Sequence, residues 1–401
     1  MKLYTNLDNA ITTVSSSLEE YNDKATYLTD LDRLIWPGKY IVRNGFPLKL
    51  ADGKYLSIKP TAADGMGKIN IITYNGAINV NGQAWGWGPN NWGQVGDGTF
   101  TSTSTPVEVC GNHTFCSANS QANHTIALDT DGQAWTWGMN SHGQLGDNST
   151  TNRGTPVAVC GGHTFCAIAT THNYSIAIDI DGQAWTWGSG FRGYLGNNST
   201  TNKCTPVAVC GGHTFVKIAA GAQHSIGLDV HGQAWTWGAN QSGGIGDGTI
   251  TDRSTPVAVC GGHTFCAIAA GAGSSYAIDL NGQAWSWGKN DDAGQPNGQL
   301  GDGTGTNRCT PVAVCGGHIF CSIYSTVFTA HAIDVNGQTW GWGSGTPIGD
   351  GESVNKCTPV AVCGGHTFIQ IAPPTALDIN GRIWGWGYPT FVPVALWDQG
   401  Y

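Results

Sequence analysis

Thirteen cysteines are the residues of this sequence best suited to covalent or metal chemistry. They recur six residues apart around a Gly-Gly-His-Thr-Phe loop, and where the later cysteine is missing, another stands six residues before the first. This exchange of positions predicts disulfides and an oxidising final location, with Cys309 left over. The predicted pairs are Cys110 with Cys116, Cys160 with Cys166, Cys204 with Cys210, Cys260 with Cys266, Cys315 with Cys321, and Cys357 with Cys363.

Two other states of the cysteines stay open at the level of the sequence. They could be reduced thiols buried in small apolar niches. Zinc is the third alternative, because His113, His163 and His263 stand close to cysteines in the sequence. Each repeat would then need its own ion, and no Cys-x-x-Cys spacing occurs. We therefore predict no metal site and no cofactor.

Two acidic patterns are similar to metal-binding loops but predict turns instead. Asp129 and Asp179 each begin an Asp-x-Asp-Gly sequence. A calcium-binding loop needs more oxygen ligands and ends in a bidentate Glu, which these sequences lack. The loops of Gly-Asp-Gly-Thr type are also interpreted as turns, and they contain Asp97, Asp247, Asp302 and Asp350.

The recurrent histidines and tryptophans occupy equivalent positions in successive repeats. A catalytic site is a single asymmetric constellation, so six equivalent histidines in Gly-Gly-His-Thr-Phe loops predict a structural hydrogen bond. The two tryptophans of each Trp-x-Trp-Gly motif share one strand face and predict core packing rather than a sugar-binding platform. No nucleophile and base stand out, and no glycine-rich phosphate loop precedes a helix. We predict no catalytic residue.

The loop after each Trp-x-Trp-Gly motif varies, although its surroundings are nearly constant. Variable loops on a rigid scaffold are where binding residues usually lie. Neutral drift at tolerant loop tips is the alternative. The predicted binding residues are Trp92, His142, Phe191, Arg192, Tyr194, Gln241, Lys289, Asp291 and Asp292.

These residues are positioned by a repeat of about 50 residues. Within one repeat, short alternating strands are separated by Asp-Gly or Asn-Gly turns, and a strand containing Thr-Pro-Val closes the unit. Seven such units predict an all-β fold, a seven-bladed β-propeller of four-stranded blades in residues 67–401. The Trp-x-Trp-Gly motifs begin at Trp85, Trp135, Trp185, Trp235, Trp285, Trp340 and Trp384.

Residues 1–66 lack the repeat and predict a small anchoring segment. A heptad pattern in residues 4–28 predicts an amphipathic helix, which either packs on its own propeller or forms an oligomerising coiled coil. Residues 39–60 contain Asn-Gly and Asp-Gly signals and predict strand, turn, strand. The heptad positions are Tyr4, Leu7, Ile11, Val14, Leu18, Tyr21, Ala25 and Leu28.

Composition excludes several kinds of partner. The net charge is −9, only 11% of residues are charged, and no Lys/Arg run occurs. Nucleic acids and anionic membrane surfaces both require a basic footprint, so neither is expected as a partner. No segment is apolar enough to span a membrane, and the first residues have no signal-peptide pattern. We expect the protein to stay inside the cell or to leave it by another route, such as release in a virus particle.

The repeat resembles that of the regulator of chromosome condensation family over residues 67–397. The resemblance is carried by copies of Trp-x-Trp-Gly, Gly-Gln-Leu-Gly-Asp-Gly-Thr and Thr-Pro-Val that recur in the same order. It implies a seven-bladed propeller. The best-known member exchanges nucleotide on a small GTPase and binds chromatin through a projecting insertion and a basic tail. The sequence has no basic tail, and its largest insertion is the loop near 291–298, so only the fold is carried over.

The leading functional hypothesis is a non-catalytic binding or structural protein of a virion. It would be a phage tail fibre or spike, or a related surface adhesin, that recognises a protein or glycan receptor or neighbouring virion proteins. Low charge, abundant Gly, Thr and Asn, and the heptad segment motivate it. The second hypothesis is a cytoplasmic interaction scaffold, including a guanine-nucleotide exchange role. The third is a glycan-active enzyme that uses the funnel of the propeller.

Overall fold

The chain divides into two compact units, Met1–Met66 and Gly67–Tyr401. In the first unit, β1 (Pro47–Lys49) pairs antiparallel with β2 (Tyr55–Ser57), within the region expected to form strand, turn, strand. The predicted heptad helix lies outside the described residues. The computed structural model describes residues 47–49, 55–57, 69–73, 76–79, 81–121, 123–292, 294–344, 348–372, 375–378, 382–385 and 392–397.

The second unit consists of seven antiparallel four-stranded sheets, the blades. The strands of the first four blades follow one another in the chain. Blade 1 is β3 (Ile69–Thr73), β4 (Gly76–Asn79), β5 (Ala84–Gly88) and β6 (Thr103–Glu108). Blade 2 is β7 (Phe115–Gln121), β8 (His124–Asp129), β9 (Ala134–Gly138) and β10 (Arg153–Ala158). Blade 3 is β11 (Phe165–Thr170), β12 (Tyr174–Asp179), β13 (Ala184–Gly188) and β14 (Lys203–Ala208), with the 3₁₀ helix η2 (Phe191–Gly193) before β14. Blade 4 is β15 (Phe215–Ala220), β16 (His224–Asp229), β17 (Ala234–Gly238) and β18 (Arg253–Ala258).

The last three blades keep this order, with one small insertion. Blade 5 is β19 (Phe265–Ala270), β20 (Ser274–Asp279), β21 (Ala284–Gly288) and β24 (Arg308–Ala313). A two-stranded hairpin, β22 (Asp291–Asp292) and β23 (Gln295–Pro296), is inserted before β24. Blade 6 is β25 (Phe320–Ser325), β26 (Thr329–Asp334), β27 (Thr339–Gly343) and β28 (Lys356–Ala361). Blade 7 is β29 (Phe368–Ala372), β30 (Thr375–Asp378), β31 (Ile383–Gly385) and β32 (Val394–Trp397).

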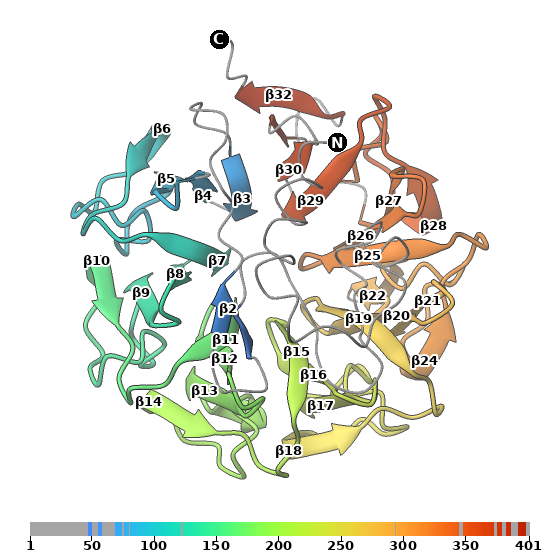
Figure 1. The fold of residues 1–401 in the computed structure, drawn as a ribbon. Coiled ribbons are helices and arrows are strands. Elements are labelled where there is room, and N and C mark those ends of the chain that lie inside the picture. Colours follow the sequence, from blue (N-terminus) through green and yellow to red (C-terminus); the bar gives the residue numbers. More distant parts are fainter. Residues whose placement is uncertain are drawn as a thin grey trace, which may run out of the picture. The chain divides into compact units, whose positions relative to one another are not determined.

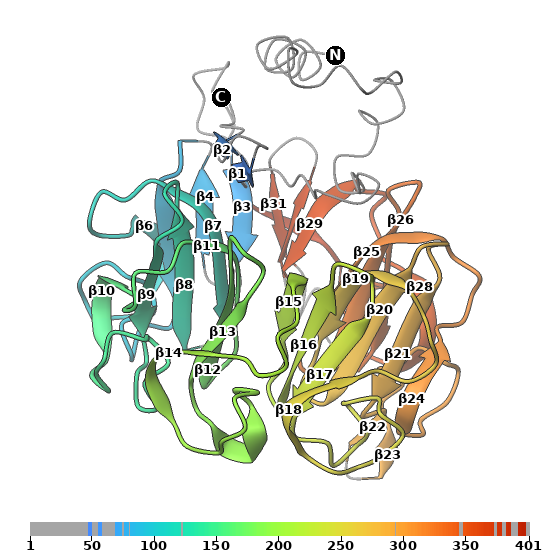
Figure 2. The same cartoon turned by 60° about the horizontal axis from the view of Figure 1, so that its bottom comes forward.

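The seven blades of this unit form a closed ring, with the first strand of each blade at the centre and the fourth at the rim (Figures 1 and 2). The prediction of a seven-bladed propeller of four-stranded blades is confirmed. Among the described strands, none is exchanged between the first and last blades, because each blade takes its four strands from one continuous stretch of the chain. Closure therefore depends on side-chain packing between blades 1 and 7. Ala77, Leu377 and Ile383 form a buried cluster at this junction, and Trp87 packs against it.

A carboxylate inside each hairpin of blades 2 to 7, replaced in blade 1 by the Asn79 amide, explains the recurrent turns. In blade 4, Asp229 Oδ1 accepts hydrogen bonds from the backbone amides of His231 (2.8 Å) and Gln233 (3.0 Å). Its Oδ2 accepts a hydrogen bond from Trp235 Nε1 at 2.9 Å. Gly232 has a φ of +78°, which glycine adopts without a Cβ clash. The same arrangement recurs at Asp129 and Asp179, so the prediction of turns rather than calcium loops is confirmed.

The second tryptophan of the motif donates an indole hydrogen bond to the neighbouring blade in blades 2, 4, 5 and 6. Trp237 of blade 4 is fully buried, and its Nε1 donates to the Tyr194 carbonyl of blade 3 at 3.0 Å. A Cβ at Gly196 would lie 2.7 Å from this indole nitrogen, so only glycine fits beneath the ring. A backbone hydrogen bond from Asn198 N to Ser254 O (2.8 Å) supports the same junction. These buried rings confirm core packing as the role of the second tryptophan.

The histidines of the Gly-Gly-His-Thr-Phe loops pack against the first tryptophan of the motif in blades 2 to 7. His263 and Trp285 have ring centroids 3.9 Å apart with tilted ring planes, and the pair recurs in six blades. A Cβ on Gly261 would lie 2.7 Å from His263 Nε2. The role is structural, as predicted, but ring packing replaces the expected hydrogen bond. The physical reason is the close approach of the glycine backbone to the imidazole edge.

The six predicted disulfides are not formed in the structure, where all thirteen cysteines are thiols. The members of each pair contact different parts of the fold. Cys116 Sγ donates to Asp129 O at 3.2 Å, whereas Cys110 Sγ lies beside Gly98 in the loop before β6. Cys357 packs on Gly298 of blade 5, whereas Cys363 lies near Gly351 of its own blade. The prediction missed this because spacing along the chain does not give the direction of a side chain.

Three more of the later cysteines form the same hydrogen bond as Cys116. Cys166, Cys266 and Cys321, in blades 3, 5 and 6, each donate to the carbonyl of the aspartate that ends the second strand, or of a neighbouring residue. Burial raises the pKa of Cys116 to about 11, which makes its thiol unreactive near neutral pH. The other predicted pair members, Cys160, Cys204, Cys210, Cys260 and Cys315, and the left-over Cys309 are also thiols.

Candidate binding site on the loop face

Antiparallel order gives the ring two faces with different connections. Loops between strands one and two and between strands three and four of each blade lie on one side, which we call the loop face. Turns between strands two and three lie on the other side, which we call the hairpin face. Backbone hydrogen bonds join neighbouring loops on the loop face, such as Lys289 N to Gly273 O at 2.9 Å. The predicted binding residues all belong to the loops between strands three and four.

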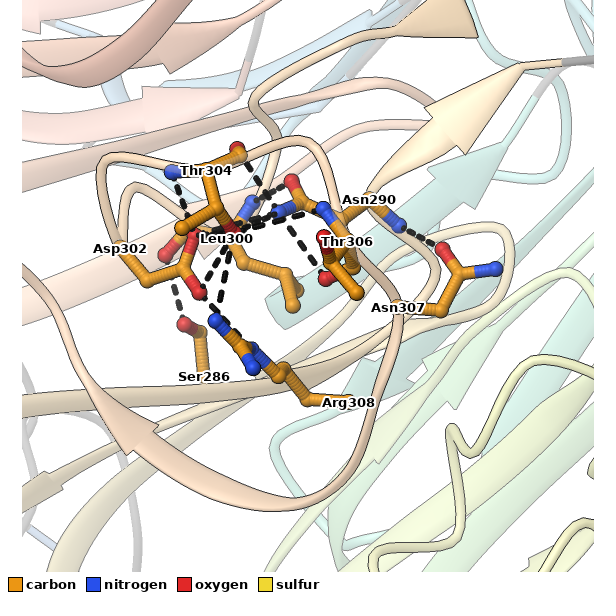
Figure 3. Close-up of polar contacts among 8 residues, drawn as sticks. All are labelled: Ser286, Asn290, Leu300, Asp302, Thr304, Thr306, Asn307 and Arg308. Carbon is orange, nitrogen blue, oxygen red and sulfur yellow. Dashed lines mark hydrogen bonds and ion pairs between the residues drawn. The ribbon is translucent and has the colours of Figure 1, made fainter. Parts of the chain in front are cut away.

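Blade 5 shows how the framework of such a loop is held (Figure 3). The Asn290 side chain is fully buried, and its Nδ2 donates to Asp302 Oδ1 (3.2 Å) and to the carbonyl of Thr304 (2.9 Å). Its Oδ1 accepts a hydrogen bond from Leu300 N at 2.9 Å. Ser286 Oγ donates to the Leu300 carbonyl at 2.6 Å. One amide side chain thus organises the whole loop.

An ion pair closes the outer end of the blade 5 loop. Arg308 Nε donates to Asp302 Oδ2 at 3.0 Å, and Thr304 Oγ1 donates to Asp302 Oδ1 at 2.8 Å. Burial alone would raise the pKa of Asp302, but the hydrogen bonds from Thr304 and Arg308 outweigh it, so this pKa lies below its usual value. Equivalent pairs form between Asp147 and Arg153 (2.8 Å), between Asp247 and Arg253 (2.6 Å), and between Asp350 and Lys356 (3.2 Å).

Blade 3 replaces this framework. Gly190 stands where blade 5 has Asn290, and a Cβ there would overlap the Thr201 carbonyl oxygen. Asn197 stands where blade 5 has Asp302, and its buried Oδ1 has no hydrogen-bond partner among the described residues. Lys203, at the start of β14, stands where blade 5 has Arg308, so blade 3 pairs this cationic position with an amide position instead of a carboxylate. The loop is held by other means.

The tip of the blade 3 loop carries an exposed aromatic ring that is held by contacts with neighbouring side chains. Phe191 is 58% exposed, and its ring packs edge-on against Tyr194 at 5.9 Å between centroids. The Arg192 guanidinium lies 5.4 Å from the Phe191 centroid and 3.3 Å from Asp252 of blade 4. Asp252 is itself fixed, because its Oδ1 accepts a hydrogen bond from Asn240 N at 2.8 Å.

Arg192 has an unusual backbone conformation. Its φ is +53°, and among the described residues it is the one residue other than Gly and Asn with a positive φ. This conformation costs on the order of 1 kcal/mol for a residue with a Cβ. The ion pair with Asp252 and the contact with Phe191 offset part of that cost. Strained backbone of this kind concentrates at functional sites.

The other predicted binding residues lie around the loop face with different exposure. Trp92 is 40% exposed, Gln241 is exposed and His142 is half-buried. Lys289 Nζ lies 5.6 Å from the Phe328 centroid of blade 6, so it contacts an aromatic ring that sequence reasoning missed. The exposed Val327-Phe328 pair was not distinguishable from a strand end in the sequence. Asp291 and Asp292 lie in the inserted hairpin, and the Asp292 side chain lies outside the described residues.

Tyr194 does not belong to the exposed set. Its side chain is buried, with 7% exposed, between blades 3 and 4. Its ring packs against Tyr174 at 5.6 Å between centroids, and its carbonyl accepts the indole hydrogen bond from Trp237. Tyr194 thus packs against Phe191 from the buried side of the loop. Asp252, which anchors Arg192, was missed because it stands on the next blade, 60 residues later in the sequence.

The described residues offer no cluster of side chains suited to a metal ion, since they contain no group of three or more His, Cys, Asp or Glu side chains that could hold one. A cavity of about 20 Å³ between blades 1 and 2 is lined by Gly86, Thr125 and Trp137, among others, and has room for about one water molecule. No helix in the described part of the chain is long and apolar enough to cross a membrane.

The ring and its repeated loops define a seven-bladed β-propeller. Residues 83–395 match the family of RCC1-like domains, so the chain belongs to that family. This agrees with the resemblance noted in the sequence. No match was found among curated proteins.

Solved structures of similar fold include propellers from human and yeast. Human WBSCR16 has a TM-score of 0.67 at 15% identity, covering 77% of this chain and 85% of that chain. Prp20p from Saccharomyces cerevisiae has a TM-score of 0.64 at 21% identity, covering 76% and 78%. Yeast RCC1 (Prp20) bound to Kap60 has a TM-score of 0.64 at 18% identity, covering 76% of each chain. At these identities the likeness concerns the fold.

Proposed function

We propose that this RCC1-like propeller binds a protein partner through its loop face, with Phe191 as the anchor of the contact. The observation that carries the proposal is a half-exposed aromatic ring held by Tyr194, Arg192 and Asp252. Aromatic and Arg side chains dominate the binding energy of protein interfaces. A ring that is already ordered loses little conformational entropy on binding.

The family supports an interaction role better than a virion role. The yeast propeller Prp20 is described in complex with Kap60, and Prp20p is described as binding Gsp1p and histones. No comparison supports the hypothesis of a tail fibre, spike or adhesin. We therefore favour the interaction scaffold among the hypotheses drawn from the sequence. The location of the protein in or outside the cell stays a prediction.

The net charge of the chain favours basic partners. At −9, the protein attracts cationic surfaces over roughly one Debye length. Histones and other basic proteins are therefore suitable first probes. A small GTPase such as Gsp1p is the second probe, and it also tests an exchange-factor-like role.

Titration of the full chain against purified core histones and purified Gsp1p tests the proposal. We expect saturable binding of one of them, weakened about tenfold or more by Phe191→Ala. Phe100→Ala is the matched control, because Phe100 is an aromatic residue that is 52% exposed in the corresponding loop of blade 1. Failure of both proteins to bind, or equal weakening by the two variants, would contradict the proposal.

Release of a fluorescent guanine nucleotide from Gsp1p separates binding from exchange. Faster release in the presence of the full chain, lost in Phe191→Ala, indicates an exchange-factor-like role. Binding without faster release indicates a scaffold, and this result leaves the binding proposal intact.

A further inference from the structure

Arg192 has a backbone conformation that its counterparts in other blades lack. Trp92, His142 and Ser242 stand at the same place in the loops of blades 1, 2 and 4, and none of them has a positive φ. In blade 3 the residue has a φ of +53° and a ψ of +22°. Glycine or asparagine adopts such angles at lower cost than arginine. The presence of an arginine here therefore points to a use for its side chain.

The guanidinium of Arg192 does not close its own loop, as those of the framework arginines do. Arg153, Arg253 and Arg308 each pair with a carboxylate of their own blade at 2.6 to 3.0 Å, and these carboxylates are 5 to 8% exposed. Arg192 instead pairs with Asp252 of the next blade at 3.3 Å, and this carboxylate is 36% exposed. The Arg192 pair is thus longer and more open to water than the other three.

The guanidinium lies at the tip of the loop beside the exposed ring. Its carbon is 5.4 Å from the Phe191 centroid, and the Arg192 side chain is 31% exposed. Its Nη1 donates to Asp252 Oδ2. A guanidinium carries five N–H donors in a planar fork, and two of them can bind one carboxylate together. Arg192 therefore has further donors for an acceptor that approaches Phe191 from solvent.

We propose that Arg192 determines specificity at this tip by binding an Asp or Glu carboxylate of the partner with two hydrogen bonds. A neighbouring apolar side chain of the partner packs on Phe191. Hydrogen bonds between guanidinium and carboxylate are about twice as strong as neutral ones, and an interface that excludes water strengthens them. This inference rests on the proposed function, because it names the group of the partner that the same site recognises.

The net charge of the chain and the carboxylate contact act at different distances. The charge of −9 attracts basic proteins before contact. At contact, a guanidinium that meets no carboxylate loses its water without compensation, which weakens the complex. Arg192 therefore selects, among the proteins that the charge attracts, those with an acidic side chain next to an apolar one.

Two substitutions separate recognition of the partner from support of the ring. Arg192→Lys keeps a positive charge beside Phe191 but loses the planar fork, and we expect it to weaken binding about tenfold. Asp252→Asn removes the ion pair and frees the whole guanidinium, while its Oδ1 can still accept the hydrogen bond from Asn240 N. We expect Asp252→Asn to leave the affinity unchanged or to raise it up to about threefold. If Arg192 served only to hold Phe191, the two effects would be reversed.

Calorimetric titration of each full-length variant against phosphatase-treated core histones and Gsp1p tests the proposal. Arg153→Lys is the matched control, because it makes the same exchange at a framework arginine of blade 2 and should leave the affinity unchanged. Thermal unfolding shows whether each variant is folded, and Arg192→Gln replaces Arg192→Lys if that variant is not.

The outcomes distinguish this inference from the proposed function. Weaker binding by Phe191→Ala, together with normal binding by Arg192→Lys or weaker binding by Asp252→Asn, would overturn the inference and leave the proposed function intact. Loss of binding on phosphatase treatment would assign the anion to a phosphoryl group and would also overturn it. Absence of binding to both proteins would overturn the proposed function and this inference together.

Discussion

The loops of blades 3 and 5 occupy equivalent places in the ring but are held by different interactions. In blade 5, Asn290 forms hydrogen bonds along the loop and Asp302 pairs with Arg308. In blade 3, Gly190 leaves no room for a side chain and Asn197 cannot form the ion pair. The blade 5 loop is stabilised from within its own blade. The blade 3 loop is stabilised partly from blade 4.

This difference explains why the tip of the blade 3 loop contacts the next blade. The blade 3 tip is joined to blade 4 by the ion pair between Arg192 and Asp252, and Phe191 at this tip stays exposed. Blade 3 lacks both the asparagine and the aspartate that hold the blade 5 loop. We interpret the exchange of internal stability for a supported aromatic tip as the mark of the binding site.

The largest expected effect comes from giving blade 5 the residue of blade 3. Asn290→Gly removes buried hydrogen bonds to Leu300, Asp302 and Thr304 and leaves an unfilled space. We expect the free energy of unfolding to fall by about 3 kcal/mol, measured by chemical denaturation. The reverse change, Gly190→Asn, should also destabilise, because the Thr201 carbonyl occupies the space. If Gly190→Asn were neutral, the two loops would not differ in framework as described.

Acid should weaken the junctions that follow blades 2 and 4 but not the one that follows blade 3. His124 Nε2 lies 2.8 Å from Ser175 Oγ of blade 3, and His224 Nε2 lies 2.6 Å from Ser275 Oγ of blade 5, whereas blade 3 has Tyr174 at this position. Burial lowers the pKa of His124 to about 3 and of His224 to about 4. The unfolded chain, with a histidine pKa of about 6.5, binds protons that the folded chain does not.

Stability should therefore fall as the pH drops below about 6.5, and by pH 5 each histidine contributes a loss of roughly 2 kcal/mol. Chemical denaturation at pH 7 and pH 5 measures the loss. His224→Gln should reduce the difference between the two pH values, even where it lowers stability at pH 7. A pH dependence equal in the variant and the unsubstituted chain would show that His224 is not buried in neutral form.

Exchanging Asp302 of the blade 5 loop and Asn197 of the blade 3 loop should change the free energy of unfolding by smaller amounts, in opposite directions. Asp302→Asn leaves Arg308 without its carboxylate and should cost about 1 kcal/mol. Asn197→Asp supplies a carboxylate for Lys203 and should stabilise by about 0.5 kcal/mol, since the surface-facing cation is partly solvated. Denaturation curves at low and high salt measure both. Destabilisation by Asn197→Asp would mean that Lys203 does not reach residue 197.

The smallest expected effect is a difference in the reactivity of the cysteine thiols, which is measured without changing the sequence. Alkylation of the denatured chain without reductant should add thirteen groups, because all thirteen cysteines are thiols. In the folded chain, Cys260, which is exposed, should react faster than Cys116, whose pKa is raised to about 11. Mass spectrometry of peptides follows both. Missing groups in the denatured chain would support the disulfides first expected from the spacing.

The ring could be predicted from the sequence because its contacts repeat. Each Asp-Gly turn is a local signal, and the first tryptophan of the Trp-x-Trp-Gly motif packs against a histidine in the same way in blades 2 to 7. The variable tips were also identifiable, since Phe191 and Trp92 stand in the loops singled out. Repetition along the chain thus carries the fold and the position of the candidate site.

Contacts between blades could not be predicted in the same way. The partner of Arg192 lies 60 residues later, and the burial of Tyr194 depends on rings from two blades. The cysteine pairs failed because spacing does not give the direction of a side chain, and Cys110 and Cys116 contact different loops. Such contacts depend on three-dimensional proximity, which a repeat alone does not specify.

Amide hydrogen exchange of the full chain, with and without saturating core histones or Gsp1p, locates the binding surface. We predict slower exchange in the peptide that contains Phe191 and in the one that contains Asp252, with little change in the peptide of Leu280 on the hairpin face. Slower exchange confined to the hairpin face, or to the blade 5 loop alone, would contradict the assignment of the binding site to blade 3.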